Sequence, residues 1–122
     1  MAIFITFEDI KAWQEGRKLM QTIRQYCNRA RAKRDFAWAD QISRSTLSVM
    51  ANIAEGHDAL SKNEFIRFLG YAKRSCAETR CHLYYGFDAG YITKKEFQST
   101  ALQAKQICAQ IASLIKYLRS SK

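Results

Sequence analysis

The 122 residues contain no proline and only five glycines. Both residue types favour turns, so a chain of this length with so few of them has few tight connections. Valine, which favours strands, occurs only once, as Val49, whereas Ala, Leu, Gln, Lys, Arg and Glu are frequent. These frequent residues have high helix propensity. The composition therefore predicts an all-α protein and excludes a β-sandwich or a β-barrel.

Metal-binding and redox motifs are missing as well. The four cysteines form no C-x-x-C pair and have no histidine at metal-ligand spacing; they are Cys27, Cys76, Cys81 and Cys108. We therefore expect no metal, no redox dithiol and no cofactor, and we interpret the cysteines as reduced thiols in a cytosolic core. No basic segment precedes a long apolar run at the N-terminus, and no uncharged stretch reaches about 18 residues. The sequence thus predicts a cytoplasmic protein that is neither secreted nor inserted into a membrane.

The length is sufficient for one domain with its own core, so residues 1–122 are expected to form a single domain. The 48% hydrophobic and 25% charged residues are typical of a folded chain rather than a disordered one. Twenty Lys and Arg against 11 Asp and Glu give a formal net charge of +9. This surplus favours polyanionic partners such as nucleic acid or an anionic membrane surface.

Capping signals and apolar spacing predict four helices, at roughly residues 7–31, 36–55, 62–87 and 94–118. Thr6 is the predicted N-cap of the first helix, and Gly56 and Gly90 are the predicted stops of the second and third. The segments Ser61–Glu64 and Thr93–Glu96 have the pattern of a capping box, which begins a helix. Because every connection is short, the helices should run antiparallel in an up-down-up-down four-helix bundle.

Each predicted helix carries apolar residues at the three-and-four spacing of a buried face. In the first helix this face consists of Ile10, Trp13, Met20, Ile23, Cys27 and Ala30, and in the second of Ile42, Thr46, Val49 and Ile53. In the third and fourth helices we expect Phe68 and Ile107, among others, to face the core. We interpret Ser45, Ser48 and Ser75 as helix-contact residues, because no histidine nearby in the sequence suggests an activated nucleophile.

The best candidate for catalysis is the segment Glu55–Asp58, which includes His57 at a predicted helix end. A general base needs a second group within reach and a pocket, and the sequence indicates neither. Helix capping and loop solvation are the alternative interpretation, which we favour. Glu78 and His82 are four residues apart and have no counterpart, unlike the paired Glu-x-x-His motifs of di-iron bundles. The sequence therefore predicts a protein without enzymatic activity.

Positive charge is concentrated in the first predicted helix. From Gly16 to Arg34, which includes the break after this helix, there are seven cations and no acid: Arg17, Lys18, Arg24, Arg29, Arg31, Lys33 and Arg34. Arg17, Arg24 and Arg31 are seven residues apart, which places them on one helical face. A phosphate backbone could bind along such a stripe, although many charged faces are simply solvated.

The third predicted helix adds Arg67, Lys73, Arg74 and Arg80 to the candidate nucleic-acid-binding residues, and the segment 97–122 contains cations but no acid. No recognised DNA- or RNA-binding motif is present, so we expect contacts to phosphates rather than to bases.

Several short motifs along the chain form a recognisable order: Phe7–Ile10, Trp13–Gln14, Gln41–Ser45, Asn52–Gly56 and Ser61–Glu78. This order resembles the four-helix-bundle family named for proteins encoded in intervening sequences of bacterial 23S rRNA genes. The resemblance implies a cytosolic antiparallel bundle that assembles as a cyclic homopentamer. It extends to a related branch, the accessory variability protein of diversity-generating retroelements, which acts beside a reverse transcriptase and binds nucleic acid through a basic surface.

Charge and resemblance together predict a non-enzymatic accessory protein that binds RNA or DNA through phosphate contacts. The protein would either associate with ribosomal RNA or act beside a reverse transcriptase, and we expect no membrane partner. The alternative is an oligomeric interaction scaffold whose basic surface docks an acidic protein, with nucleic acid incidental.

Overall fold

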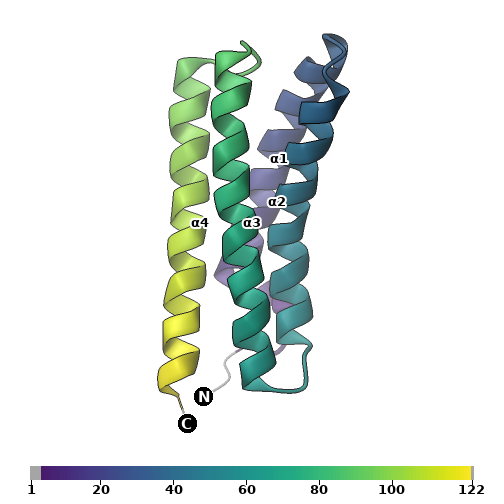
Figure 1. Ribbon diagram of the computed structural model, residues 1–122. Helices are drawn as coiled ribbons and strands as arrows, with labels where there is room; N and C mark the ends of the chain where they lie inside the picture. The colour runs from purple at the N-terminus through teal and green to yellow at the C-terminus, as the bar shows by residue number, and fades with distance from the viewer. Residues whose placement is uncertain (1–3, 122) are drawn as a thin grey trace.

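The computed structural model describes residues 4–121, and within this range the regular structure is entirely helical (Figure 1). The short 3-10 helix η1 (Phe7–Asp9) precedes α1 (Lys11–Ala32), α2 (Phe36–His57), α3 (Lys62–Asp88) and α4 (Lys94–Ser120). Each helix packs against its neighbours in sequence, and α1 also contacts α4. The start of α1 and the end of α4 lie at the same end of the bundle. This is the predicted antiparallel four-helix bundle.

Polar side chains fix the starts of three helices. The Asp35 carboxylate accepts a hydrogen bond from the Trp38 N–H (3.1 Å) at the start of α2. At the start of α4, Thr93 Oγ1 accepts from the Glu96 N–H (3.1 Å) and Glu96 accepts from the Thr93 N–H (2.9 Å). This reciprocal pair is the predicted capping box. At α3 only half of the predicted box forms. Ser61 Oγ accepts a hydrogen bond from the Glu64 N–H, as predicted, but the Glu64 carboxylate binds Arg67 instead of reaching back to Ser61.

The first predicted helix begins later than expected. Ile10 has an extended backbone (φ −78°, ψ 122°) and is buried, so it separates η1 from α1. The Asp9 carboxylate accepts hydrogen bonds from the N–H groups of Ile5 and Thr6, both at 3.1 Å, which closes η1 as a separate turn. Thr6 therefore precedes a 3-10 turn rather than α1, and the predicted start near residue 7 is wrong.

Gly56 has a different role from the predicted one. It lies inside α2, which continues to His57, so it is not the helix stop. A Cβ atom at Gly56 would lie 2.8 Å from Phe68 Cβ and 3.0 Å from Phe65 Cδ1. Glycine is thus required here because the start of α3 approaches α2 closely. The other predicted stop is confirmed: Gly90, with φ +86°, follows the end of α3.

The core follows the predicted faces in part. All four residues of the α2 face are fully buried, namely Ile42, Thr46, Val49 and Ile53. In α1, Trp13 and Met20 are only half-buried, whereas Leu19 and Tyr26, which the predicted face did not include, are buried. Phe68 was expected in the core, but it is half-buried beside Gly56. The predicted α1 face was rotated by a small angle around the helix.

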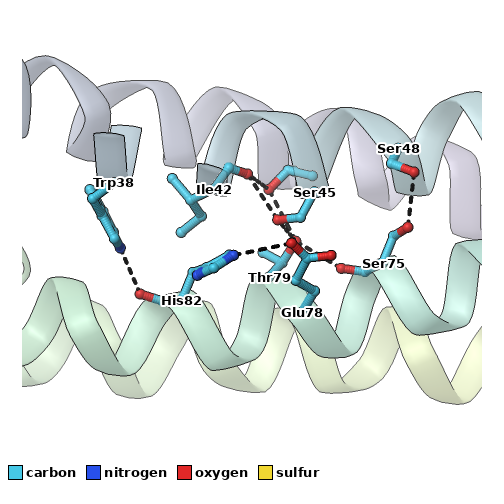
Figure 2. Close-up of polar contacts among 9 residues, drawn as sticks. Trp38, Ile42, Ser45, Ser48, Ser75, Glu78, Thr79 and His82 are labelled. Carbon is cyan, nitrogen blue, oxygen red and sulfur yellow. Dashed lines mark hydrogen bonds and ion pairs between the residues drawn. The ribbon is translucent and has the colours of Figure 1, made fainter. Parts of the chain in front are cut away.

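Hydroxyl groups join α2 to α3 (Figure 2). Ser45 Oγ lies 2.8 Å from Thr79 Oγ1, and both side chains are buried. One helical turn further along, Ser75 donates a hydrogen bond to Ser48 Oγ (2.9 Å). Small side chains let the two helices approach closely, and each buried hydroxyl has a partner. The predicted helix-contact role of the three serines is confirmed.

Candidate nucleic-acid interface

The α1 stripe has the predicted geometry. Arg17, Arg24 and Arg31 are all exposed along one side of α1. Arg31 Nη2 lies 3.8 Å from Asp40 Oδ1 on α2, and both side chains remain largely in solvent. Arg17 and Arg24 form no ion pair with any residue between 4 and 121. Two of the three arginines are therefore free to meet an external anion.

One end of the stripe, at Arg17, borders a hollow in the surface. A shallow depression of about 500 Å³ is lined by Trp13, Gln14, Arg17, Lys18 and Gln21. The charge of Lys18 is partly offset there, because its Nζ lies 3.1 Å from Glu15 Oε2. The surface around Arg17 is thus less positive than the sequence alone indicates.

Arg29, a predicted binding residue, has its donors engaged within the protein. Its guanidinium makes two hydrogen bonds to the Glu96 carboxylate (2.7 and 2.9 Å) and one to the Tyr91 carbonyl oxygen (3.1 Å). The Arg29 hydrogen bond, together with the one from the Thr93 N–H, lowers the pKa of Glu96 to about 2. The guanidinium also stacks 5.4 Å from the centre of the Tyr26 ring. Arg29 fixes the start of α4 to α1 and has few donors left for phosphate.

Arg67 is similarly engaged. Its guanidinium pairs with Glu64, and its Nη1 donates to the Tyr71 hydroxyl (3.0 Å). The hydrogen bond to Glu64, followed by the one to Tyr71, raises the pKa of Arg67. This pairing also explains why the capping box of α3 is incomplete, since Glu64 cannot serve both partners.

Lys33 and Arg34 lie at the connection between α1 and α2, and both are exposed. Lys33 Nζ sits 5.9 Å from the centre of the Tyr91 ring. Arg34 has φ +63°, which turns the chain toward α2. These cations are accessible, but they lie at the connection end of α1, away from Arg17.

A second basic surface lies between α3 and α4. Lys73 and Arg74 on α3 and Lys116 and Arg119 on α4 line a groove of about 680 Å³. All four side chains are exposed, and none forms an ion pair within the described chain. Cations gathered without acids repel one another and attract a polyanion.

The floor of this groove consists of three small residues and one isoleucine. Besides the four cations, its lining comprises Gly70, Ala77, Ala112 and Ile115. A Cβ atom added to Gly70 would have no atom within 4 Å, so the backbone there is open to the groove. Because three of the four floor positions are Gly or Ala, a phosphate can approach the cations over most of the groove.

Sequence reasoning named Lys73 and Arg74 as candidates but omitted Lys116 and Arg119. The antiparallel pairing of α3 with α4 brings the start of one helix beside the end of the other. The last third of α4 therefore lies beside the first half of α3, and this relation could have drawn attention to the α4 cations. The acid-free segment 97–122 was the second available signal.

The family model for 23S rRNA-intervening sequence proteins matches residues 8–113. The chain belongs to this family. A crystal structure of a protein of unknown function from the S23 ribosomal protein family of Bacteroides thetaiotaomicron VPI-5482 has the same fold, with a TM-score of 0.80. It is 26% identical, and the alignment covers 86% of this chain and 98% of that one. No curated protein matches the chain.

Family membership confirms the expected relationship to proteins of 23S rRNA intervening sequences, and the family's name indicates an rRNA-associated role. The matched range contains Lys73 and Arg74 but ends before Lys116 and Arg119. Half of the groove cations therefore lie in the part of α4 that follows the family match.

The candidate catalytic segment is arranged differently from an active site. His57 Nε2 lies 3.1 Å from the Phe4 carbonyl oxygen, and its Nδ1 lies 3.3 Å from Asp58 Oδ1. Both ring nitrogens thus have a partner, and the imidazole ties the start of the described chain to the end of α2. Glu55 is exposed. This geometry favours a structural role for the histidine.

No three Cys, His, Asp or Glu side chains of residues 4–121 lie close enough together to hold a metal ion. The Glu78 carboxylate contacts the His82 ring at 3.2 Å on the surface of α3. Over the same range, every helix is too short or too polar to cross a bilayer.

Proposed function

We propose that this protein is a non-enzymatic accessory protein that binds RNA by contacting phosphates in the α3–α4 groove. The observation that carries the proposal is the set of four exposed cations that have no acidic partner within residues 4–121, Lys73, Arg74, Lys116 and Arg119. Membership of a family named for 23S rRNA intervening sequences supports RNA as the polyanion.

The groove chemistry suits a phosphate backbone. Arginine can bind two phosphate oxygens at once, whereas lysine acts as a mobile point charge. The small floor, including Gly70, leaves room for the sugar–phosphate chain to approach. Because these groups contact phosphates and not base edges, binding depends little on sequence. Arg17 and Arg24 on α1 provide a second, weaker contact surface.

Two settings are consistent with this activity. In the first the protein associates with ribosomal RNA in the cytoplasm, as the family name suggests. In the second it acts beside the reverse transcriptase of a diversity-generating retroelement. The first setting is preferred because its support comes from the family match itself.

We also propose that the chain assembles as a ring of five copies. Large apolar side chains that a single bundle leaves in solvent are available for such contacts, including Leu47 (52% exposed), Tyr84 (61%) and Leu102 (56%). A ring would multiply the formal +9 of one chain fivefold, which strengthens its attraction for polyanions. Multi-angle light scattering at micromolar concentration should give about five times the mass of one chain; a monomer would contradict the proposed assembly.

The binding proposal is tested by fluorescence anisotropy with unrelated RNA and DNA oligonucleotides over a salt series. The variant Lys73→Gln, Arg74→Gln, Lys116→Gln and Arg119→Gln removes the groove charges and keeps helix propensity. For single strands each lost phosphate contact flattens the log–log salt dependence by about 0.7, so the slope should change by about 3. Affinity should fall by about 100-fold or more for every sequence alike.

The matched control removes charge from the other surface, in the variant Arg17→Gln, Arg24→Gln and Arg31→Gln. We expect its slope to change by less than about 1.4, because only two of these arginines are free. A larger change in this variant than in the groove variant would move the binding site to α1. If the unmodified protein binds no oligonucleotide at low salt, an acidic protein becomes the better candidate partner.

A further inference from the structure

The α3–α4 groove leads along α3 toward exposed aromatic side chains. Residues seven positions apart on a helix lie on nearly the same side, with a rise of about 10 Å. Gly70 and Ala77, from the groove floor, are therefore aligned with Tyr84, and a second row leads from the groove cation Lys73 to Phe87. Both rows run toward the connection between α3 and α4, so the cations and the aromatic rings share one side of the helix.

The two aromatic side chains at the ends of these rows are exposed but held in place. Tyr84 is 61% exposed and Phe87 is 36% exposed. Both contact Phe97 on α4, which packs against the core: the Tyr84 ring meets it edge to face at 4.9 Å, and the Phe87 ring stacks on it at 5.1 Å. Two rings therefore present surface to solvent from positions that a third, anchored ring fixes.

Between the groove and the aromatic rings the side chains are again basic. Arg80 on α3 and Lys105 on α4 are each seven positions from a residue that lines the groove, and neither forms an ion pair within residues 4–121. Cys81 is exposed and Cys108 is only partly buried, so the expectation that all four cysteines lie in the core is wrong for these two. The positive surface thus continues from the groove to the rings.

We propose that this surface binds single-stranded rather than double-stranded RNA, with phosphates in the α3–α4 groove and unpaired bases stacked on Tyr84 and Phe87. The inference rests on the proposed binding of RNA in the groove and adds the kind of strand that the groove accepts. Unpaired bases can be splayed out and stacked on aromatic side chains, whereas the bases of a duplex are stacked on one another. A basic groove combined with exposed rings is the arrangement that holds single strands without sequence preference.

The charge beside the rings favours nucleic acid over a second copy of the chain at this place. A contact between copies would bury or crowd Arg80 and Lys105, which have no acid to pair with in the described chain, and uncompensated buried charge is costly. A polyanion compensates the same charge. Leu47 on α2 and Leu102 on α4 lie outside the two rows of α3 and remain available for contacts in a ring.

The test measures fluorescence anisotropy of an unstructured single-stranded RNA of about 12 nucleotides and of a duplex of the same length. The unmodified protein should bind the single strand more tightly, and tighter binding of the duplex would overturn the proposal without any variant. Tyr84→Leu with Phe87→Leu removes both rings but keeps apolar side chains, helix propensity and charge. Its affinity for the single strand should fall by about 10-fold or more, with an unchanged salt slope, because no phosphate contact is lost. Its affinity for the duplex should stay the same.

Two controls separate stacking from other effects of the substitutions. Tyr84→Phe keeps the ring and removes only the hydroxyl, so it should bind the single strand as the unmodified protein does. Tyr85→Leu removes a ring of similar exposure, 54%, from a position outside the two rows, and should leave the affinity unchanged. Circular dichroism checks that each variant is folded. A loss in Tyr85→Leu equal to that of the double variant would contradict a specific role for the two rows.

The same measurements show which proposal fails. If the unmodified protein binds neither oligonucleotide at low salt, the proposed RNA binding is wrong, and the strand preference is wrong with it. If the groove variant loses binding but Tyr84→Leu with Phe87→Leu binds the single strand as tightly as the unmodified protein, only the stacking is wrong. Multi-angle light scattering on the double variant tests the competing occupant: a smaller mass than that of the unmodified protein would make the rings a contact between copies and overturn the proposal.

Discussion

The two sides of α3 differ in how they meet their neighbours. Toward α2 the helix is sealed: Thr79 is fully buried and contacts Ser45, and a Cβ on Gly56 would collide with the α3 side chains. Toward α4 the first half of the same helix borders a groove that contains Lys73 and Arg74 and, among the described residues, no acid in its lining. The sealed side stabilises the bundle through burial and satisfied hydrogen bonds. The open side carries charge that the fold does not use, which is the charge available to a partner.

The largest effect is expected from breaking the sealed side. Ile53→Ala removes a fully buried side chain of α2 and should lower the free energy of unfolding by about 2–5 kcal/mol, through lost transfer energy and a residual cavity. Urea denaturation followed by circular dichroism measures it. The matched control is Gln106→Ala on α4, an exposed position outside the proposed ring contacts, which should cost less than about 0.5 kcal/mol. Similar losses in both variants would mean that burial does not distinguish these positions.

A smaller loss should follow when the hydroxyl contact is removed without changing the shape. Thr79→Val deletes the oxygen that lies 2.8 Å from Ser45 Oγ and donates to the Ser75 carbonyl (3.1 Å). Unfolding should become easier by about 1–2 kcal/mol, because a buried hydroxyl loses a partner. Thr22→Val on α1 is the control, since the Thr22 hydroxyl has no hydrogen bond to another residue within 4–121 and should tolerate the change. A neutral Thr79→Val would show that packing alone seals α2 to α3.

The next largest loss of stability is expected when the ion pair between Arg29 on α1 and Glu96 on α4 is removed. Glu96→Gln should cost about 1 kcal/mol at neutral pH, because it removes the bidentate pair with Arg29. The folded-state pKa of Glu96 is about 2, below its ordinary 4.5, so the carboxylate's contribution is complete above pH 4.5 and is lost as the pH falls toward 2. The stability difference between the two proteins should therefore be constant near neutral pH and shrink in acid. Glu55→Gln, at an exposed position, is the control and should change the free energy of unfolding by less than about 0.5 kcal/mol at neutral pH.

Local signals in the sequence were sufficient for most of the helix boundaries. Ser61 and Thr93 begin helices as predicted because an N-cap acts on residues only three positions away. The prediction for Gly56 was wrong because glycine often ends a helix, whereas here it allows α2 and α3 to approach closely. The local sequence does not reveal this contact between two helices. The start of α1 was misplaced because the buried, extended Ile10 interrupts an otherwise favourable helical pattern.

The candidate site was harder to predict, because charge pairing is a long-range property. Arg29 looked like the other cations of its segment, yet it binds Glu96, which is 67 positions away. Arg67 pairs with Glu64, which is only three residues away on the same helix. The sequence could have predicted this pair from the spacing alone. The sequence indicates how many cations the chain has. The fold decides which of them remain unpaired.

The smallest effect on stability is expected when cations of the α3–α4 groove are removed. This prediction tests most directly whether the two sides of α3 differ. Lys116→Gln with Arg119→Gln removes two cations that have no acidic partner in the described chain, so the free energy of unfolding should change by less than about 0.5 kcal/mol near 0.15 M salt. At about 0.01 M salt, where screening extends over roughly 30 Å, the variant should become slightly more stable because repulsion with Lys73 and Arg74 is relieved. Arg29→Gln is the matched control: it removes a paired cation and should destabilise the protein at both salt concentrations. Thermal denaturation at the two salt concentrations measures all three proteins. A clear loss of stability in the groove variant would mean that these cations support the fold, and the open side of α3 would then no longer differ from the sealed one.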